Sequence, residues 1–310
     1  MGDDGLSAAM LTPADAAGFA GRAAVVVEVA PARGWMETSE VDKNRKIGGE
    51  ACQFYNANDE NRWGRDSIPA LKEKVDECLR SSKVGRKGVV AELGCGRGAF
   101  CYLAGPYRYV AMDISFEALH RFVGSPIALQ ADIEKLPLAS RSVDFVLSVA
   151  TLEHVPHPEH VLEEIHRVLK PGGTVFLAPA WFCRPWAAKG LPVRRYSDLG
   201  LGDKVRKALI PLRNSLVWRL ALVMPRRLFR EVQFRSSSGA WQFKYARLKP
   251  NLVEYIYTDC DAFSALDPHE VALLFTRLGY DVPTAPTFLR RMALRHVPVV
   301  LRKGTTPVRV

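Results

Sequence analysis

The feature that most constrains the fold is a glycine-rich turn placed directly after an apolar stretch. Val89-Val90-Ala91 lead into Glu92 and Leu93, and glycine then occupies positions 94, 96 and 98. The apolar stretch predicts a buried parallel strand. Glycines at alternate positions predict a tight turn where a ligand can approach the main chain and its N–H groups. This order is typical of open α/β sheets, which bind ligands at the carboxyl ends of their strands.

Two further acids stand at the ends of the apolar stretches that follow. Asp113 ends the stretch Tyr109–Met112, and Asp132 follows Ile127–Ala131. Because the carboxyl ends of parallel strands meet at one edge of a sheet, we expect both acids to lie near the glycine turn. The three strand ends together predict one binding site at that edge.

From position 88 onward, apolar stretches alternate with helical patterns, which predicts a parallel sheet with helices on both faces. Strands are expected at 88–93, 108–113, 126–131, 143–149, 174–179 and 297–301, and helices at 66–80, 97–104, 115–123, 158–169 and 267–278. The 310 residues are enough for one enlarged α/β domain or for a core with a large insertion.

Positive charge is concentrated in one part of the chain. The net charge is +10, and residues 181–259 hold 16 Lys and Arg against 5 Asp and Glu, so the remainder is close to neutral. This contrast marks residues 181–259 as a basic, aromatic-rich and largely helical insertion. The Ala/Gly/Pro stretches at the start and the alternating pattern from 88 predict a weakly ordered or peripheral lead (1–60), a core (61–180) and a completion of the core sheet (260–310).

The basic insertion predicts an anionic partner. Apolar and basic residues recur at helical spacing over 203–230, which also suits a membrane surface, although Arg213 and Arg219 interrupt any stretch long enough to span a bilayer. No RNA-binding module accompanies the charge, which argues against a nucleic-acid partner. Six cysteines without C-x-x-C spacing and an N-terminus without a secretory signal predict a cytoplasmic protein.

The stretch Glu92-Leu93-Gly94-Cys95-Gly96-Arg97-Gly98 resembles the first signature motif of class I S-adenosylmethionine-dependent methyltransferases. Residues 142–148 resemble the fourth-strand motif of that family. Leu152-Glu153-His154-Val155 and the pattern ending at Lys170-Pro171-Gly172-Gly173 resemble the subfamily that acts mostly on small molecules. The resemblance is specific from about 88 to 180 and much weaker from Asp259 onward.

The resemblance implies a Rossmann-like, doubly wound sheet of seven strands, the last antiparallel, with a helical insertion after the fifth. It places Asp113 at the ribose hydroxyls, Asp132 and the Ile133 N–H at the adenine, and Glu92 near the ammonium group of S-adenosyl-L-methionine. The cofactor contacts expected in this way are Glu92, Gly94, Cys95, Gly96, Gly98, Asp113, Ile114, Asp132, Ile133 and Ser148.

The implied reaction is methyl transfer from S-adenosylmethionine to a small-molecule acceptor. A saccharide, a glycolipid or a natural-product intermediate is the expected acceptor, and the insertion is expected to cover it as a lid. The charge of the insertion favours an anionic acceptor, so neutralising Arg226, Arg227 and Arg230 is expected to weaken acceptor binding.

Two other functions compete with this interpretation. Gly94, Gly96 and Ala99 also fit the G-x-G-x-x-[GA] pattern of nicotinamide-dependent oxidoreductases, with Asp113 about 20 residues further on. Gly98 and the second acid, Asp132, are not needed for that function. A non-catalytic protein that keeps the fold and binds a partner through its basic insertion is the other alternative.

His154, His157 and His160 form an H-x-x-H-x-x-H pattern. Because prolines at 156 and 158 break any continuous helix there, the three rings need not share a face, and no metal site is expected. His154 follows the fourth core strand and is expected to face the acceptor. Histidine titrates near neutral pH, so His154 is the candidate general base.

Overall fold

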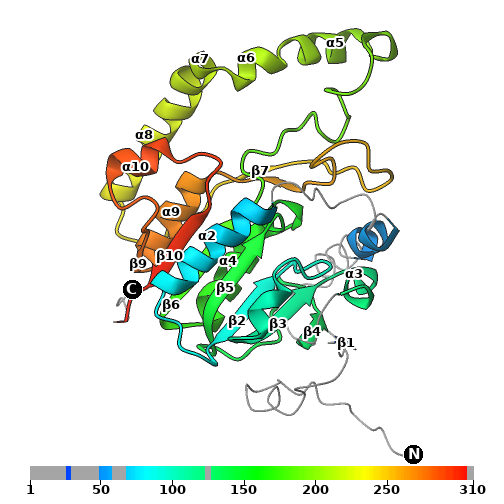
Figure 1. Ribbon diagram of the computed structural model, residues 1–310. Helices are drawn as coiled ribbons and strands as arrows, with labels where there is room; N and C mark the ends of the chain where they lie inside the picture. Colours follow the sequence, from blue (N-terminus) through cyan, green and yellow to red (C-terminus); the bar gives the residue numbers. More distant parts are fainter. Residues whose placement is uncertain (1–25, 29–48, 58–67, 123–126, 306–310) are drawn as a thin grey trace, which may run out of the picture. The chain divides into compact units, whose positions relative to one another are not determined.

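The computed structural model describes residues 26–28, 49–57, 68–122 and 127–305 (Figure 1). Within it the chain divides into two compact units. The first comprises Met1–Leu152 and Pro156–Leu177, and the second comprises Glu153–Val155 and Ala178–Val310. The predicted lead falls largely on 1–25 and 29–48, which lie outside the described residues.

The first unit is built on a sheet whose strand order is β1-β4-β3-β2-β5-β6. Strand β2 pairs in parallel with β3 on one side and with β5 on the other. The chain therefore winds outward from β2 in both directions, which defines a doubly wound sheet with a switch point beside β2. The strands are β1 (Val26–Glu28), β2 (Val89–Leu93), β3 (Arg108–Asp113), β4 (Ile127–Gln130), β5 (Val143–Val149) and β6 (Leu169–Ala178).

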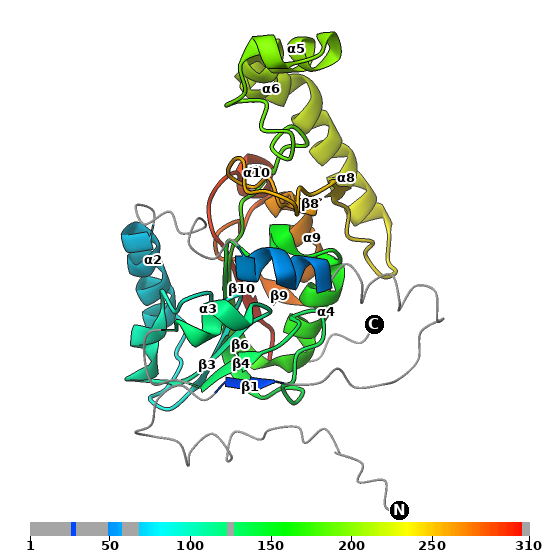
Figure 2. The ribbon, with the colours of Figure 1, turned by 90° about the vertical axis from the view of Figure 1, so that its right-hand side faces the viewer.

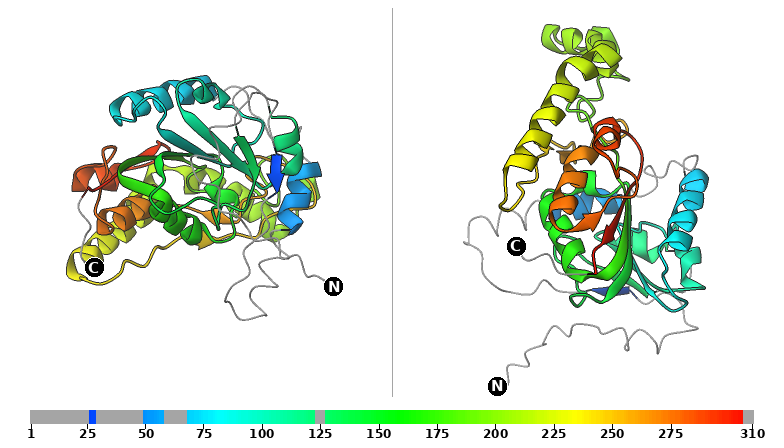
Figure 3. Two further views of the ribbon diagram at one scale, coloured as in Figure 1. Left: turned by 90° about the horizontal axis from the view of Figure 1, so that it is seen from below. Right: turned by 90° about the vertical axis from the view of Figure 1, so that its left-hand side faces the viewer.

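Helices α2 (Ile68–Ser81) and α4 (Pro158–Val168) lie on opposite faces of this sheet (Figure 3). Helix α4 begins with Pro158, where the absent N–H of proline costs nothing, and it buries Val161, Leu162 and Ile165 at helical spacing. Both helices lie close to their predicted ranges. The apolar spacing of each sequence segment thus determines which side of the helix faces the sheet.

Two predicted helices are shorter than expected. The range 97–104 contains only the 3₁₀-helix Cys101–Ala104, because the glycine turn extends through Gly98, whose φ is +85°. The range 115–123 contains α3 (Phe116–His120), whose first turn is capped by the Ser115 hydroxyl accepting the Ala118 N–H at 3.2 Å.

Residues 49–57 form a helix that sequence analysis did not predict. Its Ala51, Phe54 and Tyr55 side chains are buried. The Cys52 thiol donates to the Ile114 carbonyl at 3.2 Å, and the Asn56 side chain accepts from the Ser115 hydroxyl at 2.8 Å. This helix therefore contacts the residues that follow Asp113, at the predicted binding edge.

The second unit contains an antiparallel strand pair and a series of helices. Strand β10 (Val299–Lys303) pairs with β9 (Tyr280–Asp281), which confirms an antiparallel last strand. Strands β2 to β6, β9 and β10 supply the seven strands expected, and β1 is additional. A short antiparallel pair joins β7 (Ala246–Arg247) to β8 (Ser264–Ala265), and α9 (Pro268–Arg277) and α10 (Phe288–Ala293) complete the unit.

A run of helices follows β6, which confirms the helical insertion after the fifth core strand. It comprises α5 (Leu201–Ala208), α6 (Ile210–Asn214), α7 (Leu216–Trp218), a π-helical turn (Arg219–Val223) and α8 (Met224–Ser236). We call residues 201–236 the arm. Among the described residues, none of the helices is both long and apolar enough to cross a bilayer.

Candidate functional site

The glycine turn after β2 has a backbone that favours glycine at three positions. Gly94, Gly96 and Gly98 have φ angles of +75°, +52° and +85°. A Cβ on Gly94 would lie 2.2 Å from the Thr151 hydroxyl oxygen, and one on Gly98 would lie 2.7 Å from the Phe122 ring. Both the backbone conformation and the packing around the turn therefore require glycine.

Asp113 connects the glycine turn to the end of β3. Its carboxylate accepts the Gly96 N–H and the Ser115 N–H, each at 2.8 Å. The side chain remains partly exposed. These two bonds hold a carboxylate at the edge of the sheet beside the switch point, which is where the sequence placed the ribose-binding acid.

Asp132 lies at the same edge of the sheet. Asp113 pairs with Gln130 across β3 and β4, so Asp132 follows two residues beyond that pair. Its exposed carboxylate accepts the Glu134 N–H at 2.9 Å, which fixes the turn that follows. Ile133 beside it is buried. The structure therefore brings the two predicted acids to adjacent strand ends of one sheet.

Three other predicted cofactor contacts are buried inside the protein. Glu92 is 2% exposed and accepts a hydrogen bond from the Tyr109 hydroxyl. Burial, reinforced by the nearby Asp113 charge, raises the pKa of Glu92 well above its usual range. The Ser148 hydroxyl donates to the Leu93 carbonyl at 3.2 Å. Burial also raises the pKa of the Cys95 thiol, as suits a small residue that fills space between glycines.

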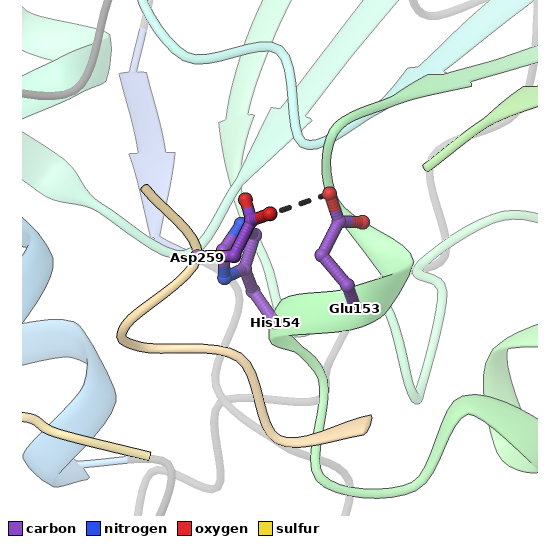
Figure 4. Close-up of side chains that lie close together, drawn as sticks. All are labelled: Glu153, His154 and Asp259. Atoms are coloured by element: carbon purple, nitrogen blue, oxygen red, sulfur yellow. Dashed lines mark ion pairs between the residues drawn. The ribbon is translucent and has the colours of Figure 1, made fainter. Parts of the chain in front are cut away.

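In the second unit, His154 lies among acidic side chains (Figure 4). Its Nδ1 is 3.2 Å from an Asp261 carboxylate oxygen, and its Nε2 is 3.8 Å from Glu153 Oε1. One donor atom from each of Glu153, His154 and Asp259 lies within 4.8 Å of the others. We call Glu153, His154, Asp259 and Asp261 the acidic cluster.

A tight turn places the two aspartates of the cluster. The Cys260 N–H donates to the Tyr257 carbonyl at 3.0 Å, and the Ala262 N–H donates to the Asp259 carbonyl at 3.2 Å. Asp259 has a φ of +57°, a left-handed conformation that aspartate tolerates better than most residues. The Phe263 N–H donates to the Glu153 carbonyl at 2.8 Å, which ties the turn to the 3₁₀-helix Leu152–His154.

Glu153 is the most buried acid of the cluster, with no exposed surface. Its Oε1 accepts the Ala180 N–H at 2.8 Å, whereas its buried Oε2 has no hydrogen-bond partner. Burial raises the pKa of Glu153 to about 8, and the Asp259 and Asp261 charges add to the effect. Glu153 therefore carries a proton at neutral pH. Burial and Asp261 also raise the pKa of Asp259.

The other two histidines of the H-x-x-H-x-x-H pattern belong to the first unit. Their ring centroids are 5.2 Å apart, and His160 Nδ1 lies 3.4 Å from Glu134 Oε2. The sequence pattern points to His154 but not to Glu153, Asp259 or Asp261. The two aspartates flanking Cys260 were the available signal, but they stand about 100 residues from His154.

A glycine turn and two acids at the carboxyl edge of a doubly wound parallel sheet define a Rossmann-like nucleoside-binding fold. Residues 91–177 match the methyltransferase domain family. The match confirms the resemblance to class I S-adenosylmethionine-dependent methyltransferases that the glycine motif predicted.

Two curated relatives are named as methyltransferases. The chain is 32% identical over 98 residues to the malonyl-(acyl-carrier protein) O-methyltransferase of Hamiltonella defensa, which covers 30% of this chain and 38% of that protein. It is 26% identical to the fatty-acid O-methyltransferase of Mycolicibacterium smegmatis, over 54% of this chain and 65% of that protein. The chain thus spans less than two thirds of the length of these curated relatives.

Among solved structures, one similar chain comes from the complex between the Haloferax volcanii Trm112 methyltransferase activator and a methyltransferase. It shares 27% identity at a TM-score of 0.35, and the match covers 42% of this chain and 62% of that one.

S-adenosylmethionine is the cofactor of this family, and the donor set of the first unit fits it. Asp113 and Asp132 offer carboxylate oxygens to hydroxyl and amino groups at neighbouring strand ends, beside a turn that has no side chain at three positions. Two carboxylates beside a glycine turn suit a nucleoside, because the carboxylates can accept hydrogen bonds from its sugar hydroxyls and its amino group.

Proposed function

We propose that the protein transfers a methyl group from S-adenosylmethionine to a small-molecule acceptor. The observation that supports this most strongly is the position of Asp113 and Asp132 at adjacent strand ends beside the glycine turn, inside the region that matches the methyltransferase family. The match to the methyltransferase family covers residues 91–177 and so does not include the basic insertion. The proposal therefore rests on the residues of the first unit.

In this proposal Asp113 holds the ribose hydroxyls while it also fixes the glycine turn. Asp132 and the Ile133 N–H hold the adenine, and Ile114 lines the same edge. Gly94, Gly96 and Gly98 leave room for the methionine part. Glu92 and Ser148 hold the strand ends in place through their buried hydrogen bonds to Tyr109 and to the Leu93 carbonyl. When bound, S-adenosylmethionine supplies an electrophilic methyl group on a positively charged sulfur.

His154 is the proposed general base on the acceptor side. A hydroxyl or amine acceptor loses a proton as it attacks the methyl group, and a histidine within reach can accept it. Asp261, 3.2 Å from Nδ1, orients the ring and stabilises the imidazolium that forms. Protonated Glu153 keeps the cluster from accumulating negative charge around the ring.

For the acceptor we propose a saccharide, a glycolipid or a natural-product intermediate, held under the insertion. Two of the relatives are named for O-methylation of a fatty acid and of a malonyl group on a carrier protein. Of these three acceptors, a glycolipid also carries an apolar part that could contact the exposed apolar side chains of the arm.

Cofactor binding tests the proposal directly. Titration calorimetry is expected to show S-adenosylhomocysteine binding to the purified protein, and no binding of NAD. Asp113→Ala is expected to lose roughly tenfold to a hundredfold in S-adenosylhomocysteine affinity, because it removes charge-assisted hydrogen bonds. His154→Gln is the matched control, since a residue on the acceptor side leaves cofactor affinity unchanged.

The competing functions give different results. NAD binding without a response to S-adenosylhomocysteine would identify an oxidoreductase, and no binding of either would favour the non-catalytic alternative. If Asp113→Ala binds S-adenosylhomocysteine as tightly as the wild type, Asp113 serves only to fix the turn. An equal loss in His154→Gln would contradict the acceptor-side position of His154.

A further inference from the structure

The arm exposes an unusual amount of apolar surface. Eleven large apolar side chains between Leu201 and Val232 are each at least 42% exposed, and Leu201 and Val217 reach 82% and 68%. From α5 through Leu209, the residue between the two helices, to α6, exposed apolar residues recur every three or four positions, so they form one stripe: Leu201, Val205, Leu209 and Leu212. Surface of this kind on a folded chain marks an interaction site.

The stripe is separate from the face that the arm uses within its own unit. Ile210 packs on a buried cluster of Trp186, Leu191 and Leu199. The Arg213 guanidinium lies over the Trp186 ring. Ile210 and Arg213 therefore attach the arm to the rest of its unit. The exposed leucines of the stripe do not belong to this buried cluster.

A π-helical turn keeps the apolar stripe aligned along the second half of the arm. Leu216 and Leu220 are four residues apart, and Leu228 and Val232 are again four apart. The eight residues from Leu220 to Leu228 exceed two α-helical turns of about 3.6 residues by nearly one residue. The π-helical turn over Arg219–Val223 accommodates about that extra residue, which returns Leu228 to the side of Leu220.

The charge of the arm is strongly positive. Residues 201–236 contain nine Lys and Arg and only two Asp and Glu. Arg206, Arg226 and Arg235 are exposed. Figures 1 and 2 show the helices of the arm following one another as a bent rod that leads away from α9 and α10 within this unit. The combination of exposed leucine and exposed arginine is that of a helix lying in a membrane interface.

Not every arginine of the arm is available to a partner. Arg227 and Arg230 are 1% and 5% exposed. They pair with Asp267, which caps the N-terminus of α9, and with Glu270 in its first turn. The expectation that these two residues, with Arg226, bind an anionic acceptor is therefore wrong for both of them. They hold α8 to α9. Arg206 pairs with Asp203 at 3.0 Å but stays exposed, and it remains with the exposed Arg226 to meet an anionic surface.

We propose that the arm docks on the surface of a membrane containing anionic lipids. The leucines of the stripe enter the boundary between headgroups and acyl chains, and the exposed arginines contact lipid phosphates. A second copy of the chain fits less well, because it would bring two strongly basic arms together. This inference does not depend on the proposed methyl transfer.

Vesicle binding tests the proposal. The wild-type protein is expected to co-sediment with phosphatidylcholine vesicles that contain phosphatidylglycerol, and to bind pure phosphatidylcholine vesicles much more weakly. The double variant Leu216→Ser, Leu220→Ser is expected to lose about tenfold or more in affinity, because two exposed leucines no longer enter the interface. Val253→Ser with Leu289→Ser is the matched control, since both residues are exposed and lie outside the arm.

The electrostatic contribution needs its own variant. Arg206→Gln with Arg226→Gln is expected to weaken binding to the anionic vesicles by about fivefold per arginine, with a smaller loss at high salt. Three results would overturn the proposal: no binding of the wild type to anionic vesicles, equal binding to both vesicle types, or an equal loss in the Val253, Leu289 control. Wild-type self-association without vesicles that the leucine variant abolishes would assign the stripe to a second copy instead.

Discussion

Glu153→Gln is expected to make the protein more stable than the wild type above neutral pH. Glu153 has no exposed surface, and burial raises its pKa from 4.5 to about 8. Between these two values the folded state binds a proton that the unfolded state has released. The wild-type free energy of unfolding therefore falls as the pH rises through this window, and the loss is complete above the folded pKa.

Glutamine removes this loss because it cannot ionise. Its side-chain oxygen can still accept the Ala180 N–H that Glu153 Oε1 accepts at 2.8 Å. A shift of this size corresponds to a difference on the order of 4 kcal/mol between acidic and alkaline pH. The measurement is the free energy of unfolding by denaturant at about pH 5 and about pH 9, for the wild type and the variant.

The comparison of the two proteins at each pH separates titration from packing. A change that is equal at both pH values would come from packing of the amide and would contradict the raised pKa of Glu153. Asp203→Asn is a useful control. Hydrogen bonds from Lys189 and Arg206 lower the pKa of Asp203 despite the opposing effect of burial, so its substitution does not stabilise the protein at alkaline pH.

Arg227→Met is expected to destabilise the second unit by roughly 3–5 kcal/mol, which is typical of removing one partner of a buried ion pair. The Arg227 guanidinium donates to Asp267 at 2.6 Å and to the carbonyls of Met292 and Leu294 at 2.6 and 2.9 Å. Methionine fills similar space but leaves these acceptors without their donor.

The neighbouring Arg226 is the matched control, because it has the same side chain but is exposed. Arg226→Met is expected to change the free energy of unfolding by less than about 0.5 kcal/mol. Denaturant unfolding of both variants measures the difference. If both substitutions cost the same, the network around Arg227 does not stabilise α8 against its neighbours.

Local patterns were enough to predict most of the sheet. Strands β2 to β5 lie within a residue of their predicted ranges, because short apolar stretches bounded by turn residues specify buried strands. The positions of Asp113 and Asp132 followed from this, since the ends of parallel strands share an edge. The shortened helix after Gly98 could not be predicted in this way, because it depends on the left-handed backbone that Gly98 adopts (φ +85°), which extends the turn into the range expected for the helix.

Contacts between distant parts of the chain were not predictable from local patterns. His154 was selected by its place after β5, but its partner Asp261 lies about 100 residues further on. The charge count over 181–259 included Arg227 and Arg230 but stopped before Asp267 and Glu270, which neutralise them. A segment that looks uniformly basic in sequence thus contains both buried ion pairs and a basic surface.

The two ion pairs between α8 and α9 also determine how the helices align along their length. The arginines are three residues apart on α8, and their acids are three residues apart on α9. If α8 slid by one turn, Arg227 would meet Glu270, while Arg230 and Asp267 would each lose a buried partner. Only one longitudinal alignment satisfies all four charges. The pairs therefore fix the position of α8 along α9 at the base of the arm, whereas at the other end Asp203 of α5 forms exposed pairs with Lys189 and Arg206.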